Sequence, residues 1–269
     1  MWENLKVNAP SPIRSMKDFW NLLFFTVRCR LKSEASTSYL SYGWWVAEPI
    51  LYMATFYLVF GILMSQGKGD FVPYLLTGLV PWLWFNKSVS NSTGAILGGQ
   101  HIMLQTRVPV ALFPAAAVTQ DSVKQFAVFM LLMLVLLAVG KTPSIHWIAI
   151  IPLALVQLAF TTCVAFVVAG IVPFFPDARF LVDTGLVMMM FMSGIFYSYD
   201  LILPEHQPLF FLNPMANIIK NYRDILLHNQ WPDWNALSII FIACIVFLII
   251  TIAVYRKYRT KYVRIVLES

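Results

Sequence analysis

The chain has 269 residues, of which 59% are hydrophobic and only 12% are charged, and its formal net charge is +6. Soluble domains carry about 25% charged residues, so this composition excludes an ordinary soluble domain and indicates a membrane protein. Three cysteines are present, at positions 29, 163 and 244, and none lies in a Cys-x-x-Cys pair. This spacing implies neither a disulfide framework nor a zinc site.

Residues 1–43 are polar to amphipathic, and we expect a helix from Arg14 to Lys32 that lies in the membrane interface. Apolar residues recur at helical spacing on one side of it: Trp20, Leu23, Phe24, Val27 and Leu31. A soluble surface helix is the alternative, and the membrane span that follows argues against it. No signal peptide is expected, since the first apolar run of spanning length starts at Trp44.

Six apolar stretches follow, and each approaches or exceeds the ~20 residues that cross ~30 Å of hydrocarbon. They are Trp44–Met64, Phe71–Val89, Leu112–Val139, Ile145–Val172, Phe180–Tyr197 and Leu237–Tyr255. With the N-terminus inside, fourteen of the 19 Lys and Arg residues fall in inside segments and four in outside segments. The positive-inside rule therefore predicts that both termini are cytoplasmic. The expected layout is a cytoplasmic segment (1–43), a six-span domain (44–255) and a basic cytoplasmic tail (256–269).

The second and third stretches are joined by an unusual connection. An apolar helix over residues 74–85 turns polar at 86–93, passes a small-residue hinge at 94–99 and ends in a short mixed segment at 100–107. A span that delivers a short polar helix to one face and returns at once can serve as a lever on which a soluble partner pushes. An ordinary loop between two spans is the alternative.

The segment between the fifth and sixth stretches contains a short amphipathic helix. Asn213 suits the N-cap and Pro214 the first helical position. At about 14 residues the helix is too short to span, so we expect it to dip into the outer leaflet and return, paired with residues 200–212. Its apolar face, expected to contact lipid or neighbouring spans, is Met215, Ile218, Ile219, Tyr222 and Leu226. Its polar side chains, expected to face a wet exit, include Asn217, Asn221 and Arg223. A helix lying flat on the surface is the alternative.

The sequence offers no convincing catalytic constellation. The nearest approach to a phosphate loop, residues 61–69, has five residues between its first two glycines instead of four, and Gly69 where Ser or Thr must bind magnesium. No cluster of His, Cys and carboxylates has metal-ligand spacing, and the serines lack convincing His and Asp partners. We therefore expect no catalysis within this chain.

Charged and aromatic residues within or next to the apolar stretches have two interpretations each. Asp121 and Lys124 are three apart and can pair on one helix face, which favours a structural bridge over a functional site. Glu48 suits a role in a pathway or a helix cap equally well. The aromatics Tyr39, Tyr42, Tyr52, Phe56, Tyr197 and Tyr199 would suit a path for sugars, which stack on aromatic faces. An interfacial aromatic belt is the alternative.

Five segments, in order along the chain, resemble the type-2 ABC export permeases, and most of all the polysaccharide and polyol-phosphate exporters. They are GWWVAEP (43–49), GLVPWLWF (78–85), TRVPVALFP (106–114), FFPDAR (174–179) and FLNPMANIIKNYRDILL (211–227). The similarity covers about residues 15–255, and the second and fifth segments are the most specific. One departure is FFPDAR, where similar chains usually have Phe-Phe-Arg-Asp.

The resemblance implies a homodimer with two copies of a separate ATPase subunit, which would bind ATP and magnesium, so that this chain has no cofactor of its own. It implies that residues 94–107 form a coupling helix in a cleft of that ATPase, with His101, Leu104, Gln105 and Arg107 entering the cleft. It implies that residues 200–227 gate the outer exit, with Met215, Ile218, Ile219, Tyr222 and Arg223 in the gate. The channel would be lined by spans one, two and five and by Glu48 and the aromatic set named above.

The resulting prediction is an all-α permease in the bacterial inner membrane that exports an undecaprenyl-diphosphate-linked glycan of O-antigen type. Its expected partners are its own second copy, the ATPase, this substrate and membrane lipids, with no nucleic acid. Exporters of teichoic acid, capsule, drugs or small lipids are alternatives of the same fold. A membrane glycosyl- or acyltransferase is a further alternative, but it requires a clustered acid/base pair at one membrane face.

Overall fold

The computed structural model describes residues 16–37, 71–105 and 108–268, together with positions 43, 47, 50–52, 54, 55, 58, 59 and 62. Regular structure in this part of the chain is helical and contains no strand, in agreement with the all-α prediction. The predicted first span, Trp44–Met64, falls mostly outside the described residues. The structure therefore tests the other five predicted spans.

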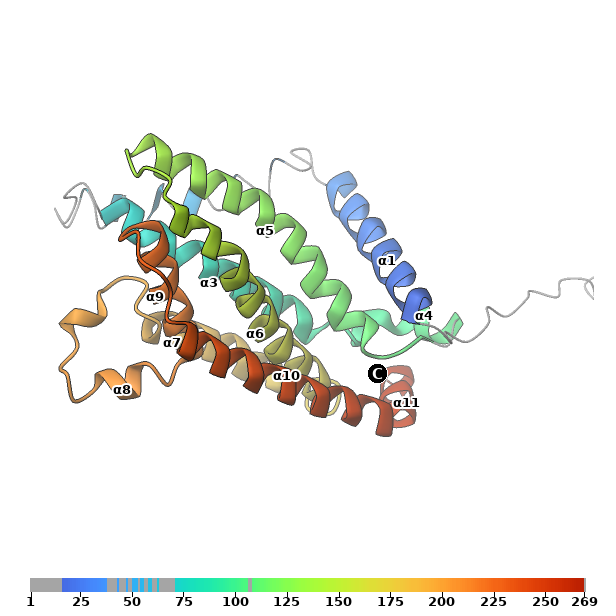
Figure 1. Ribbon diagram of the computed structural model, residues 1–269. Helices are drawn as coiled ribbons and strands as arrows, with labels where there is room; N and C mark the ends of the chain where they lie inside the picture. The colour runs from blue at the N-terminus through green and yellow to red at the C-terminus, as the bar shows by residue number, and fades with distance from the viewer. Residues whose placement is uncertain are drawn as a thin grey trace, which may run out of the picture.

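Among the described residues, three helices are long and apolar enough to cross a membrane, and their bounds match predicted spans closely. They are α5 (Leu112–Ala138), α6 (Ile150–Ile171) with η4 (Ile145–Ala149) before it, and α10 (Trp234–Lys257). A fourth long helix, α3 (Phe71–Thr93), coincides with the second predicted span and ends in polar residues. These helices pack along one another as a bundle (Figure 1).

The fifth predicted span, Phe180–Tyr197, corresponds to a shorter helix, α7 (Ala178–Met192). Its 15 residues extend about 22 Å at ~1.5 Å per residue, which is less than the ~30 Å hydrocarbon core. Soon after the helix ends, Gly194 has a positive φ of 68°, a conformation that glycine adopts readily beyond helix C-termini. The chain then turns through η5 (Tyr199–Leu201) toward α8 (Gln207–Phe210).

The predicted interfacial helix is present as α1 (Met16–Thr37), which continues beyond the predicted end at Lys32. Leu23 and Val27, four residues apart, are buried against the bundle. Trp20 and Phe24 belong to the same predicted apolar face, yet they are 50% and 61% exposed. The stripe that contacts the bundle is thus narrower than the apolar face, and the exposed aromatics suit a helix that also meets lipid.

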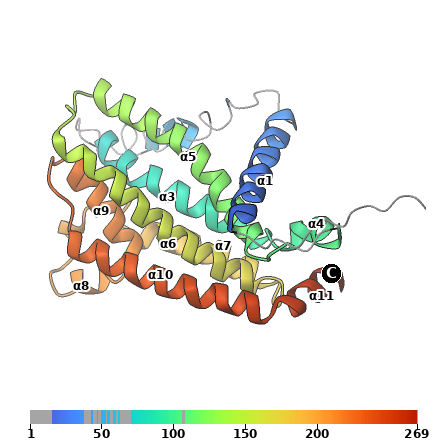
Figure 2. The same ribbon diagram turned by 45° about the vertical axis from the view of Figure 1, so that its right-hand side comes forward.

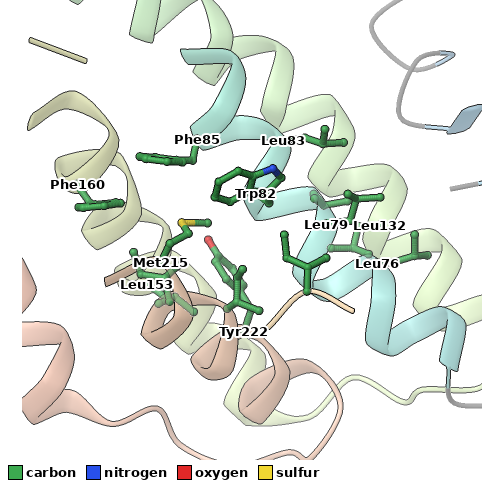
Figure 3. Close-up of a cluster of buried hydrophobic side chains, with 14 of the residues drawn as sticks. Leu76, Leu79, Trp82, Leu83, Phe85, Leu132, Leu153, Phe160, Met215 and Tyr222 are labelled. Carbon is green, nitrogen blue, oxygen red and sulfur yellow. The ribbon is translucent and has the colours of Figure 1, made fainter. Parts of the chain in front are cut away.

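The centre of the bundle is α3, which packs against α5, α6, α7 and α9 (Pro214–Leu226). Figure 3 shows Met215 and Tyr222 of α9 reaching toward Trp82 of α3, while Phe160 of α6 lies beside Phe85 of α3. The last two rings are stacked with centroids 5.1 Å apart. Close packing of these large side chains anchors α9 to the bundle, because helices within a membrane are held together mainly by van der Waals contacts and interhelical hydrogen bonds.

The bundle has two distinct ends (Figures 1 and 2). One carries α4 (Gln100–Gln105) and α11 (Arg259–Glu268), and we refer to it as the α4 end. The other carries α8, α9 and the connection between α5 and α6, and we refer to it as the α9 end. Helix α3 starts toward the α9 end and leads into α4 at the opposite end, so a single helix links the two.

Candidate functional site

At the α4 end, the segment predicted to couple to a partner is split into a hinge and a short helix. A turn at residues 94–96 and the 3-10 helix η3 (Leu97–Gly99) lead from α3 into α4. His101 and Ile102 of α4 are exposed. Leu104 and Gln105 belong to the same helix, while Arg107 lies outside the described residues. The structure therefore places a short helix with an exposed face where the lever was predicted.

The hinge is tightly packed. Ile96 is fully buried in a hydrophobic cluster that also contains the fully buried Phe113 of α5. Gly99 lies directly against the Phe113 ring, so that an added Cβ atom would overlap the ring carbons. Backbone bonds from Gly98 N to Gly94 O (2.9 Å) and from Gly99 N to Ile96 O (3.1 Å) close the turns. A force applied to α4 is therefore resisted by the start of α5 as well as by α3.

Helix α11 lies beside α4, in the stretch 256–269 that is expected from the sequence only to be a basic tail. The Tyr262 hydroxyl donates to Gly170 O at the end of α6 (3.0 Å), and Val266 is fully buried. Tyr262 and Val266 are four residues apart, so they lie on one side of the helix, and this spacing is the signal that could have predicted the packing. Its exposed basic residues widen the surface that the α4 end presents.

Charged and polar side chains connect α1, α3 and α5. The predicted Asp121–Lys124 pair exists at 3.8 Å, and Lys124 Nζ lies 2.6 Å from Glu34 Oε2 of α1. Asp121 is buried and accepts from Asn91 Nδ2 of α3 (2.9 Å). Burial lowers the pKa of the Arg30 guanidinium from its ordinary value, and the charge of the nearby Asp121 opposes this. The pair is thus part of a network that docks α1, which agrees with the structural bridge favoured from the sequence.

At the α9 end, the predicted amphipathic helix is confirmed as α9, with its start where the N-cap signal placed it. Asn213 Oδ1 accepts from Met215 N (2.9 Å), and Pro214 occupies the first turn. The predicted apolar face is buried against neighbouring helices: Met215, Ile218, Ile219 and Tyr222 are each 0% exposed. Because α9 is held on this face by the bundle core, it is not a loose external loop.

The predicted exposure of the polar face is wrong for two residues. Asn221 is 1% exposed, and its Oδ1 accepts from Asp233 N (2.7 Å), just before α10. Arg223 is 6% exposed, and its guanidinium donates to Gly194 O (2.8 Å) and Ile195 O (2.9 Å). Both side chains find backbone partners inside the protein, and of the Arg223 nitrogens only Nε is buried without a hydrogen-bond partner.

The aromatic set predicted to line a path is only partly described. Tyr39, Tyr42, Glu48 and Phe56 lie outside the described residues, and Tyr52 is 42% exposed. Tyr197 and Tyr199 lie at the α9 end, with ring centroids 6.2 Å from Phe210 and 5.6 Å from Phe211, respectively. The structure therefore places these two tyrosines against α8 and the residue that follows it.

These features define a multi-pass helical membrane protein whose central helix links an exposed short helix at one end to a buried amphipathic helix at the other. Within the described part of the chain, no group of three or more His, Cys, Asp or Glu residues is placed to hold a metal ion. Residues 22–227 match the family model for ABC-2 type transporters, so the chain belongs to this family.

Relatives extend along most of the chain. Over 247 residues, this chain is 27% identical to the O-antigen export system permease protein RfbA of Klebsiella pneumoniae. The aligned region covers 91% of this chain and 95% of that protein. The protein of the same name from Myxococcus xanthus is 27% identical over 253 residues, covering 93% and 97%. The polysialic acid transport protein KpsM of Escherichia coli is 25% identical over 223 residues, covering 81% and 85%.

Proposed function

We propose that this chain is the permease subunit of an ABC exporter that moves a lipid-linked polysaccharide of O-antigen type across the bacterial inner membrane. The observation that carries the proposal is the similarity over more than nine tenths of the chain to two permeases named for O-antigen export. The inner membrane transport permease YadH of Escherichia coli, whose name specifies no polysaccharide, aligns over only 66% of the chain. The similarity is therefore more extensive to the polysaccharide exporters.

In this proposal the α4 end is cytoplasmic, and α4 docks into a cleft of a separate ATPase subunit. The exposed His101 side of α4 supports this orientation, as does the basic α11 beside it, because cytoplasmic segments are rich in Lys and Arg. ATP and magnesium are bound by the partner, whose nucleotide-driven movements push on α4. Two copies of the chain enclose the channel, and two ATPase subunits bind beneath them.

The α9 end then faces the periplasm and closes the channel at rest. A channel wide enough for sugars must be sealed against ions between transport cycles. Ile218 and Ile219 are fully buried, and Tyr197 and Tyr199 contact aromatic side chains, so α9 and the segment before it are packed firmly on the bundle, as a gate that is closed at rest requires. The substrate is an undecaprenyl-diphosphate-linked glycan, and capsule or teichoic acid polymers are the nearest alternatives.

The proposal is tested in cells that lack this chain but keep its ATPase and the glycan-synthesis enzymes. We expect these cells to lose surface glycan and to accumulate lipid-linked glycan on the cytoplasmic side, and the intact chain to restore export. Affinity purification of the restored chain should recover the ATPase in a 1:1 ratio, as expected for a dimer of each. Normal surface glycan in the deletion strain would rule the proposal out.

A further inference from the structure

Arg223 of α9 lies in a slot formed by two other elements, the end of α7 and α3. Its Nη1 and Nη2 atoms donate to Gly194 O (2.8 Å) and Ile195 O (2.9 Å), just beyond the C-terminus of α7. A helix C-terminus carries partial negative charge, so a cation beside the end of α7 is favoured. Hydrogen bonds from a charged donor are also stronger than neutral ones. These contacts tie α9 to the end of α7.

Helix α3 forms the other wall of the slot. The guanidinium carbon of Arg223 lies 3.6 Å from the centroid of the Tyr74 ring, a cation–π contact. The Tyr74 hydroxyl donates to Tyr197 O (2.7 Å), so the same residue also holds the chain after α7. One turn further along α3, a Cβ atom at Gly78 would lie 2.7 Å from Arg223 Nη2. Any larger residue at position 78 would displace the guanidinium.

The other end of α3 leads into the hinge and α4. From Gly78 to Thr93 the helix extends about 22 Å at ~1.5 Å per residue, in the direction of the α4 end. Inside this length, Gln125 Nε2 donates to Val80 O (3.0 Å) and Gln157 Nε2 to Pro81 O (2.8 Å). Pro81 has no backbone N–H and so cannot bond the carbonyl group of Thr77, four residues earlier. The bonds from α5 and α6 tether α3 beside this gap, at Val80 and Pro81.

We propose that Arg223 is the positioning residue through which α3 sets the place of α9. When the partner pushes on α4, α3 moves with it, and the Tyr74–Gly78 wall carries the guanidinium away from the two carbonyl groups. Loss of those bonds frees α9 from the end of α7 and opens the outer exit. This inference rests on the proposed function, in which α4 couples to an ATPase and α9 closes the channel.

The slot geometry predicts a specific genetic interaction. Gly78→Ala should reduce export by about tenfold, because the added methyl group and the guanidinium compete for the same space. Arg223→Lys keeps the positive charge but removes the planar guanidinium that binds both carbonyl groups at once. This variant should reduce export less, by about threefold. In the double variant the clash is absent, so export should return to the level of Arg223→Lys alone. A residue that stabilised α9 without fitting this slot would give no such rescue.

Movement of α9 is measured by the rate at which maleimide labels a cysteine that replaces Ala216. Ala216 is 2% exposed and lines the same small space as Arg223. The background carries Cys29→Ser, because Cys29 is the exposed native thiol among the described cysteines. The Ala216→Cys chain is assembled with its ATPase and treated with maleimide, with and without ATP and vanadate. If nucleotide raises the fraction of molecules with an open gate from about 10% to about 50%, the labelling rate should rise about fivefold.

When Arg223→Lys is added, nucleotide should raise the labelling rate of Ala216→Cys by less than about twofold, although the ATPase still hydrolyses ATP. Lys220→Gln is the matched control. Lys220 is a cation on the same helix that lines the same small space, but its ammonium group contacts Asp224 of α9, Tyr199 of η5 and Phe211 after α8, and not the carbonyl groups beyond α7. This variant should keep the fivefold rise.

The outcomes separate the two proposals. If the unmodified chain supports no glycan export, the proposed function fails. The role of Arg223 is refuted, while the function stands, in either of two cases in which the chain exports glycan. In the first, nucleotide does not raise the labelling rate of the Ala216→Cys form. In the second, nucleotide raises it fully in the presence of Arg223→Lys. If Arg223→Lys fails to assemble, the Gly78→Ala single variant decides, because it keeps Arg223 and displaces only the guanidinium. Full export by that variant, with the full nucleotide-dependent rise in the labelling of Ala216→Cys, refutes the role.

Discussion

Gly98 and Gly99 offer a matched pair of substitutions in the hinge before α4. A Cβ atom at Gly99 would overlap the ring of Phe113, which is fully buried, whereas a Cβ atom at Gly98 would meet no atom within 4 Å. Gly98→Ala and Gly99→Ala therefore make the same chemical change. Only the second forces the hinge to move against α5, because the ring has no free space in which to turn.

The expected difference in stability follows from these surroundings. Forcing a methyl group into a well-packed core costs about 1–3 kcal/mol. In open space, replacing glycine by alanine stabilises a protein by about 0.4–1 kcal/mol through the unfolded chain. The free energies of unfolding of the two variants should therefore differ by about 2 kcal/mol, with Gly99→Ala the less stable.

The assay compares thermal unfolding in detergent with glycan export and ATP turnover of the assembled complex. Gly98→Ala should match the unmodified chain in glycan export and ATP turnover and should unfold at a slightly higher temperature. Gly99→Ala should unfold at a lower temperature and export less, because a displaced hinge misplaces α4 in the partner's cleft. Adding Phe113→Leu should recover part of the loss by removing the ring. Equal unfolding temperatures and equal export for the two alanine variants would refute the packing argument.

Three further predictions concern other parts of the molecule. Replacing Leu104 and Arg107 together by Ala should lower export and stimulated ATP turnover with membrane insertion intact, and unchanged export would remove the coupling assignment. Replacing Tyr39, Tyr42 and Tyr52 by Leu should lower export without loss of the dimer; equal export of long-chain glycan by the triple variant would assign these residues to an aromatic belt. Lys124→Met takes a cation from beside the buried Asp121 and should lower the free energy of unfolding by about 2 kcal/mol. Adding Asp121→Asn should recover stability, and a double variant no more stable than Lys124→Met would contradict this account of the network.

Helix positions were predictable from the sequence wherever long apolar runs met a clear boundary signal. The bounds of α5 and of α6 with η4 differ from the predicted spans by one residue at the C-terminal end, and α9 begins directly after its predicted N-cap, Asn213. The fifth span was predicted too long because the apolar run continues past Gly194, whose positive φ follows the end of α7. Composition alone does not reveal that backbone turn.

The surroundings of polar side chains were less predictable. Helical periodicity correctly separated the two faces of α9, but it does not say whether a polar face meets water or backbone carbonyl groups. Arg223 was assigned to a wet exit, and its guanidinium is instead bound to Gly194 O and Ile195 O. Helix α11 was not predicted for a related reason: charged residues are interspersed with the apolar ones in this stretch, and composition does not show that Tyr262 and Val266 are buried.

The central claim, that this chain conducts polysaccharide under the control of a separate ATPase, is tested most directly by reconstitution. The chain and its ATPase are placed in proteoliposomes with an undecaprenyl-diphosphate-linked glycan, and glycan delivered to the protected side is measured over time. We expect ATP-dependent delivery that stops when the ATPase cannot hydrolyse ATP. Delivery at the same rate without ATP, or no delivery by a complex that binds its ATPase and hydrolyses ATP, would contradict the claim.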